Sequence, residues 1–144
     1  MSGPCLAEGL PAPAPDGLDA PYWDSAREER LVVQRCRGCD AWQWGPEWIC
    51  HRCLGFDLGF DAVEPAGRIY AYERVWHPVH PALAEQGPYV VVLVELPQAD
   101  GVRMIGNLLG APQQPVRVGA PVSAAFEHHP DEDPAFSLVQ WRLV

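Results

Sequence analysis

Residues 31–53 read LVVQRCRGCDAWQWGPEWICHRC, and this stretch decides the first half of the fold. Cys36 and Cys39 form one C-x2-C pair, and Cys50 and Cys53 form a second pair after ten intervening residues. Each pair places two thiolates at the tip of one tight turn, so four sulfurs can surround one ion. In a reducing compartment this pattern favours a metal site over two disulfides. The stretch therefore predicts a metal ribbon built from two knuckles.

The ion expected at these four cysteines is Zn²⁺, because four sulfurs at about 2.3 Å satisfy its tetrahedral geometry. Iron is the alternative occupant, since an all-sulfur tetrahedron suits it too. Four protein ligands leave no open position for water, so we expect a structural rather than a catalytic site. His51 lies between Cys50 and Cys53 and could replace one ligand, but we expect it to be exposed. Gly38 is expected to give the first knuckle the tight turn that aims N–H groups at sulfur.

The residues before the ribbon predict a tail and one short helix. Residues 1–18 are rich in proline and are predicted to be a flexible linker or tail, in which Cys5 is incidental. An aspartate suited to the N-cap and a proline in the first turn predict a helix over residues 19–30. Tyr22 and Trp23 project from this helix. Two interpretations stay open: the pair packs on its own domain, or it docks onto a partner.

The residues after the second knuckle predict a connector and a small β-barrel. The zinc ribbon with its connector is assigned to residues 31–66, and the barrel to residues 67–144. Turn signals separate five candidate strands, at residues 68–76, 89–96, 102–109, 121–128 and 136–143. Five strands match the OB-fold, and Gly106 suits a tight bend where such a barrel closes. The fold class is therefore mainly β, with a short N-terminal helix, a four-cysteine zinc ribbon and an OB-fold barrel.

The first barrel strand, RIYAYERVW, carries a stripe of arginine and aromatic side chains. A period of two puts five residues on one face, namely Arg68, Tyr70, Tyr72, Arg74 and Trp76. Such a face stacks bases in OB-folds, and arginine can grip the phosphates of a nucleotide-like ligand such as coenzyme A. Alternatively, the aromatic rings fill the barrel interior. His77 and His80 follow in the predicted loop between the first two strands, where OB-folds bind ligands.

Composition limits the partners and the compartment. The chain has 144 residues and a net charge of −9, and its ten basic residues are all arginine. This acidity disfavours nucleic acid as a partner, because basic side chains supply most of that affinity. No run of about 20 apolar residues is present, so we expect no membrane span. The N-terminus lacks the pattern of a signal peptide, which makes the cytoplasm the expected location.

The sequence offers no catalytic constellation. None of its serines lies in a G-x-S-x-G elbow, and it has no Walker loop and no G-x-G-x-x-G. The histidines lie at predicted strand ends or loops without an adjacent nucleophile, and HHPDEDP at residues 128–134 is predicted to be a solvated loop. We therefore assign no catalytic residue and expect no measurable catalysis by the chain alone.

The order of these segments resembles the domain-of-unknown-function 35 family of bacteria and archaea. An aromatic pair on a short helix and the four-cysteine ribbon are followed by GRIYAYERVWHP, PYVVVLVEL, VRMIGNLLG, VGAPVSAAFE and a closing strand. The resemblance covers about residues 20–143. It implies a rubredoxin-like zinc ribbon joined to a C-terminal OB-fold.

The resemblance also implies a function among enzymes of acyl-CoA metabolism. An archaeal member bridges acetoacetyl-CoA thiolase and hydroxymethylglutaryl-CoA synthase. In actinobacterial steroid catabolism a similar domain follows a hydratase-like domain and partners a thiolase-fold, lipid-transfer-protein-like aldolase that shortens the steroid side chain. The implied role is a non-catalytic accessory subunit, in a heterotetramer, of an aldolase or thiolase that itself handles acyl-CoA or steroid-CoA. The chain is either free-standing or part of a larger hydratase subunit.

Two other functions fit the same architecture. A zinc ribbon with an OB-fold also serves proteins that bind single-stranded nucleic acid, although the negative charge and the absence of lysine argue against this function here. A rubredoxin-like electron carrier would require iron at the four cysteines.

Overall fold

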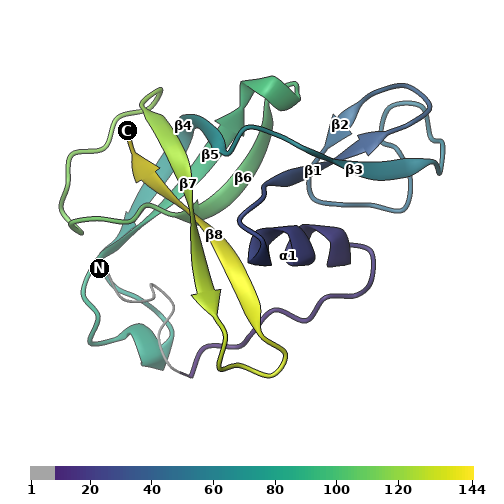
Figure 1. The fold of residues 1–144 in the computed structure, drawn as a ribbon. Helices are drawn as coiled ribbons and strands as arrows, with labels where there is room; N and C mark the ends of the chain where they lie inside the picture. Colours follow the sequence, from purple (N-terminus) through teal and green to yellow (C-terminus); the bar gives the residue numbers. More distant parts are fainter. Residues whose placement is uncertain (1–8) are drawn as a thin grey trace.

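The computed structural model describes residues 9–144; Cys5 and the first eight residues of the predicted tail lie outside the described part. This described part forms one short helix, a small sheet and a five-stranded barrel (Figure 1). The helix is α1 (Ala20–Arg27), the small sheet contains β1 (Val32–Cys36), β2 (Trp42–Gln43) and β3 (Leu58–Ala62), and the barrel contains β4 (Ala66–Val75), β5 (Tyr89–Leu96), β6 (Val102–Asn107), β7 (Pro121–His129) and β8 (Phe136–Leu143). Two 3-10 turns, η1 (Pro81–Leu83) and η2 (Pro97–Ala99), lie in barrel loops.

The ribbon sheet has the order β2-β1-β3, with both pairs antiparallel. Strand β1 pairs with β2 through Gln34 and Gln43, and with β3 through five residue pairs from Val32↔Ala62 to Cys36↔Leu58. Strand β3 is an addition to the sequence prediction, which treated residues 54–66 only as a connector. Its sequence, LGFDA, contains a glycine and no clear alternation, so only its pairing with the distant β1 makes it a strand.

The barrel confirms the five predicted strands and the OB-fold class. Its strand order is β6-β5-β4-β7-β8, and all neighbours are antiparallel. A parallel bridge between Leu108 and Trp141 brings the two outer strands together and nearly closes the barrel. Strand β5 alternates between half-buried and buried residues, and its buried members Val90, Val92 and Val94 belong to the main hydrophobic core.

Gly106 lies where β6 approaches β8 most closely. A Cβ atom at this position would lie 2.8 Å from Cδ1 of Trp141 and 2.9 Å from the carbonyl oxygen of Val139. Trp141 is completely buried and is the largest of the fully buried side chains in the described part of the chain. Glycine is therefore required there for the barrel to close around this indole.

Helix α1 lies between the ribbon and the barrel, and it contacts β1, β7 and β8 (Figure 1). It ends at Arg27, three residues before the predicted end, and Glu29 adopts a left-handed conformation with φ 57°. Ala26 is fully buried in the main core, and Tyr22 packs against that core. Within residues 9–144, no helix is long and apolar enough to cross a bilayer.

Candidate metal centre

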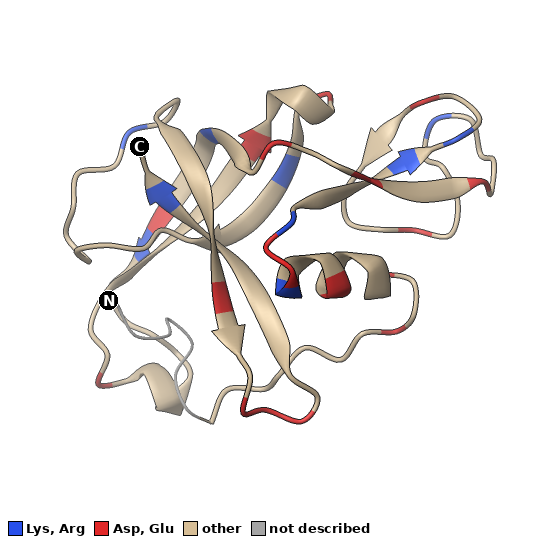
Figure 2. Cartoon of the chain, viewed as in Figure 1, with Lys and Arg blue, Asp and Glu red and all other residues tan. Residues whose placement is uncertain are grey.

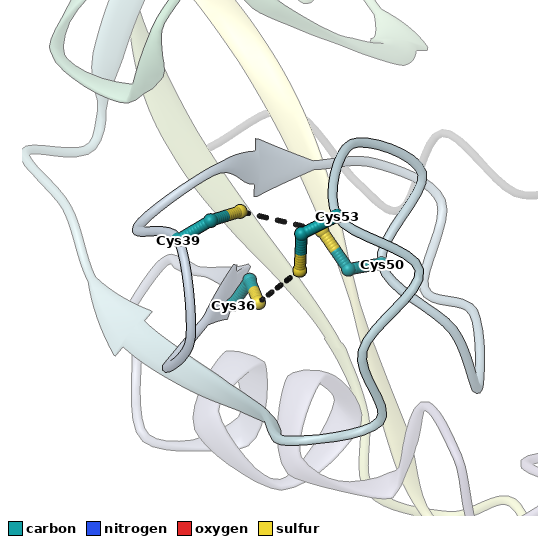
Figure 3. Close-up of side chains that lie close together, drawn as sticks. All are labelled: Cys36, Cys39, Cys50 and Cys53. Atoms are coloured by element: carbon teal, nitrogen blue, oxygen red, sulfur yellow. Dashed lines mark hydrogen bonds between the residues drawn. The ribbon is translucent and has the colours of Figure 1, made fainter.

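The structure brings together all four cysteines that the sequence predicted as ligands (Figure 3). Their Sγ atoms lie within 4.8 Å of one another. Cys36 faces Cys53 and Cys39 faces Cys50, each with an Sγ–Sγ distance of 3.6 Å. Tetrahedral zinc with bonds of about 2.3 Å separates its sulfurs by about 3.8 Å. The cluster therefore has the size that one such ion requires, and its four cysteines are free of disulfides.

The two knuckles have equivalent backbones. In the first knuckle the amide of Cys36 donates to the carbonyl of Ala41 at 2.8 Å. In the second knuckle the amide of Cys50 donates to the carbonyl of Gly55, also at 2.8 Å. The ion site thus lies between two matching turns, each of which presents two sulfurs from the same side.

The left-handed residue of each knuckle directly follows its second cysteine. Asp40 and Leu54 both have φ 62°, and each donates its amide to the carbonyl of the first cysteine at 3.0 Å. Gly38 lies in the first turn as expected, without a positive φ, and a Cβ atom there would lie 3.6 Å from the sulfur of Cys36. Leu54 is unusual at such a position, since branched side chains meet steric strain in the left-handed region.

Backbone N–H groups aim at the sulfurs and favour the thiolate form of one of them. The pKa of Cys50 is lowered to about 6, because the amides of Cys53 and Arg52 hydrogen-bond its sulfur. The Ala41 amide acts in the same sense on Cys39, but desolvation and the other thiols raise the pKa of Cys39 to about 11. Four thiolates so close together require a cation between them. The donor set therefore fits a thiolate-binding metal ion such as zinc.

Two buried glutamines support the loop that carries the second knuckle. Gln34 and Gln43 are 1% and 4% exposed, and Nε2 of Gln43 donates to Oε1 of Gln34 at 2.7 Å. Gln34 also bonds both backbone groups of Glu47, at 2.9 and 3.0 Å. Gln43 donates to the carbonyl of Ile49 at 3.2 Å and accepts from the amide of His51 at 3.0 Å. This pair was not predicted from the sequence, in which its only signal is a polar residue at an apolar strand position.

An ion pair joins the first knuckle to β3. Nη2 of Arg37 lies 2.6 Å from Oδ1 of Asp61, and its Nη1 lies 2.9 Å from Oδ2. The guanidinium of Arg37, through this hydrogen bond, lowers the pKa of Asp61. The Arg37 side chain also covers Gly59, where a Cβ atom would collide with it. This contact fixes the knuckle against the sheet that leads to the barrel.

A β-bulge divides the arginine and aromatic stripe predicted on β4. The register of β4 against β5 shifts between Ile69 and Ala71, so Tyr70 is the extra residue. Beyond the bulge, Tyr72 pairs with Val92 and so shares the side of the sheet on which Val92 lies, although Tyr72 itself is 41% exposed. The stripe is not a single face, because one extra residue moves every following side chain to the other side.

The predicted stripe residues consequently have different environments. Tyr70 stacks under the guanidinium of Arg103 at 3.6 Å, on the outer face that also carries Arg68. Arg74 donates to the carbonyls of Pro112 and Gln114, at 3.0 and 2.6 Å. Trp76 is exposed. These contacts do not form the continuous stacking platform that the sequence suggested.

Two of the other predicted site residues, His80 and Tyr22, make contacts within the chain. Nδ1 of His80 accepts from the amide of Ala82 and caps η1, whereas His77 is an exposed loop residue. The ring of Tyr22 packs at a tilt against that of Trp44, with ring centroids 4.7 Å apart, and burial raises the pKa of Tyr22. This packing favours the interpretation that the aromatic pair rests on its own chain.

The two histidines of residues 128–134 are not in a solvated loop, which corrects that prediction. Both belong to β7, and His128 lies opposite Ser137 on β8. Nδ1 of His128 is 2.6 Å from Oγ of Ser137, and Nε2 is 2.9 Å from a carboxylate oxygen of Glu29. Ser137 is only 2% exposed, so its hydroxyl is buried within the hairpin and not presented to solvent. The arrangement ties the end of α1 to the β7–β8 hairpin.

Comparison with family models identifies both halves of the chain. Residues 23–59 match the ChsH2 rubredoxin-like zinc ribbon domain, and residues 61–127 match the ChsH2 C-terminal OB-fold domain. In fold comparison the chain matches a chain of the "Ltp2-ChsH2(DUF35) aldolase", with a TM-score of 0.77 and 33% identity. This match covers 92% of the present chain and 98% of the other. A DUF35-family protein of unknown function from Sulfolobus solfataricus shares the fold, with a TM-score of 0.59 and 13% identity over 90% and 87% of the two chains.

Two curated relatives are longer proteins. The "Probable enoyl-CoA hydratase alpha subunit" of Thermomonospora curvata is 40% identical over 114 residues, which are 78% of this chain and 34% of the relative. The "3-oxo-4,17-pregnadiene-20-carboxyl-CoA hydratase alpha subunit" of Mycobacterium tuberculosis is 29% identical over 146 residues, which are 92% and 44%. The chain thus spans less than half the length of the curated relatives that it matches.

Proposed function

The chain belongs to the ChsH2 (DUF35) family, and from that premise we propose that it is a non-catalytic accessory subunit of an aldolase that acts on acyl-CoA. The single observation that carries the proposal is the likeness, at 33% identity over nearly the full length of both chains, to a chain of the Ltp2-ChsH2(DUF35) aldolase. The partner would be a thiolase-fold aldolase subunit, in a heterotetramer with two copies of each chain.

The proposed reaction is the retro-aldol cleavage that shortens a steroid side chain carried as a CoA thioester. The support is the name of the Mycobacterium tuberculosis relative, a hydratase alpha subunit for a pregnadiene carboxyl-CoA. Carbon–carbon cleavage belongs to the partner in this proposal. The present chain would bind and stabilise the partner in its active form.

The proposed metal is one structural Zn²⁺, held by Cys36, Cys39, Cys50 and Cys53. Support comes from the size of the sulfur cluster and from the amides that hydrogen-bond two of its sulfurs. All four positions around the ion would be filled by protein, so the ion would supply rigidity to the ribbon rather than chemistry.

Co-expression with an Ltp2-type aldolase subunit tests the function. We expect the two chains to elute together in size-exclusion chromatography at the mass of a heterotetramer, and to release a steroid ketone from a β-hydroxyacyl-CoA substrate. The aldolase subunit alone should be less soluble or less active. Separate elution, together with full activity of the aldolase subunit by itself, would remove the accessory role.

A further inference from the structure

The second knuckle exposes an unusual concentration of large apolar side chains. Trp48, Ile49, Leu54 and Phe56 are 67%, 38%, 65% and 78% exposed. The hydrogen bond from the amide of Cys50 to the carbonyl of Gly55 brings the two ends of this segment next to each other. From their exposed fractions, and from the area that one aromatic ring can bury, these four side chains expose roughly 450 Å². We call them the knuckle patch.

The backbone under the knuckle patch is fixed before any partner arrives. The buried glutamines bond the backbone on both sides of Trp48, at Glu47 and at Ile49. Burying two amide side chains is costly unless they are bonded, and here their bonds hold a loop whose own side chains point to solvent. Such preorganisation lowers the entropy that binding would otherwise cost.

Leu54 places an exposed apolar side chain at the position that Asp40 holds in the first knuckle. It combines the left-handed conformation with 65% exposure, so its side chain gains little burial within its own chain. Glycine or asparagine would adopt this conformation more easily.

We infer that the knuckle patch is the docking centre for a distinct protein subunit whose surface is apolar in the middle and basic around it. This inference rests on the proposed function, and the aldolase subunit is the intended partner. The patch amounts to about half of the roughly 800 Å² that each partner buries in a standard interface. It can therefore form the apolar core of such an interface, with charged residues around it.

Charge distinguishes this partner from other occupants of the patch. Residues 31–62 contain three arginines and four acidic residues, whereas the whole chain has a charge of −9 (Figure 2). The exposed carboxylates of Glu47 and Asp57 flank the patch on either side in the sequence, and with the exposed Arg52 between them this segment keeps a net charge of −1. A second copy of the chain would bring −9 against −9, and an anionic membrane would repel it likewise. A partner with a basic rim would instead be attracted.

The experiment measures binding of the zinc-loaded chain to a purified Ltp2-type aldolase subunit by calorimetry at two salt concentrations. Trp48→Ser is matched with Trp76→Ser, because Trp76 is 54% exposed on the barrel. Leu54→Ser is matched with Val118→Ser, whose side chain is similarly exposed at 66%. Zinc content and circular dichroism confirm that each variant is folded.

We expect each knuckle-patch variant to weaken binding at least tenfold, and each barrel variant to change it less than threefold. Wild-type affinity should fall as salt rises, because a basic rim faces an acidic chain. Wild-type affinity in both folded knuckle-patch variants would overturn the patch while leaving the accessory role intact. Absence of binding by the wild-type chain would overturn both. If the wild-type chain self-associates and Trp48→Ser abolishes this, the occupant of the patch is a second copy. If the wild-type chain binds anionic vesicles and Trp48→Ser abolishes this, the occupant is a membrane. Either result would overturn the inference.

Discussion

Replacing Gln43 with leucine tests whether the buried glutamine pair holds the second knuckle in place. The substitution removes three hydrogen bonds, to Oε1 of Gln34, to the carbonyl of Ile49 and from the amide of His51. Each contributes about 0.5–1.5 kcal/mol net, so their loss predicts a destabilisation of about 2–4 kcal/mol. Water can replace the lost hydrogen-bond partner at the exposed residues Ile49 and His51. We therefore expect a destabilisation near the lower end of this range, about 2 kcal/mol.

Two measurements report this effect separately. Thermal unfolding with zinc in excess should show a midpoint lowered by about 8 °C for a chain of this length. Hydrogen exchange should show faster exchange of the His51 amide, which loses its acceptor. The Cys36 amide, which donates to the carbonyl of Ala41, should keep its protection because the first knuckle is unchanged.

Gln98→Leu is the matched control. Gln98 also makes two hydrogen bonds, to the carbonyls of Glu64 and Ala66, but it is exposed, so water can replace them. We expect its unfolding free energy to change by no more than about 1 kcal/mol. Equal effects of the two substitutions, or an unchanged exchange rate of the His51 amide in Gln43→Leu, would refute the reasoning.

Three further predictions address the metal, the barrel and an ion pair. Metal analysis should find one zinc per wild-type chain and none in Cys39→Ser, whose ribbon should unfold. Cys5→Ser should keep its zinc. Zinc retained by Cys39→Ser would contradict the site. Gly106→Ala should lower the unfolding free energy by about 1–3 kcal/mol in denaturant titration, because its methyl group would press on β8; no change would contradict the close approach. The guanidinium of Arg37 holds the pKa of Asp61 below the usual carboxyl value. The ion pair of Arg37 with Asp61 therefore stabilises the fold above about pH 4, and this stabilisation is lost as the pH falls through the lowered pKa. Asp61→Asn should remove this part of the acid dependence, as measured by unfolding at pH 7 and at pH 3.

The structure gives Trp23, one of the two aromatic residues expected on the N-terminal helix, contacts within its own chain. Its indole donates to Oδ2 of Asp19 at 2.9 Å, and its ring packs edge-on against Tyr22. Trp23→Ala would therefore disturb the start of α1 as well as any partner contact. The knuckle patch separates the two effects better, because its side chains contribute little to the fold of their own chain.

The sequence by itself determined the class of the fold and the membership of the sulfur cluster. Cysteine spacing predicts a four-sulfur cluster without tertiary information, because each pair is local and both pairs can serve one ion. The five barrel strands were also readable, because alternation and turn residues are local signals. The C-terminal end of α1 and the strand β3 were not, because the left-handed Glu29 and the pairing with β1 leave little local trace.

Only the tertiary structure decided which faces the side chains occupy. The bulge at Tyr70 reverses the alternation of β4, and one extra residue in a strand leaves no signal in a period-two pattern. Pairings between distant segments also decide the two side-chain hydrogen bonds, Gln34 with Gln43 and His128 with Ser137. The exposure of Trp48 depends on such pairings too. Local sequence determines the residue types and the alternation of apolar and polar positions. Whether a side chain lies in the core, bonds a neighbouring loop or stays exposed is determined by the segments that pack against it.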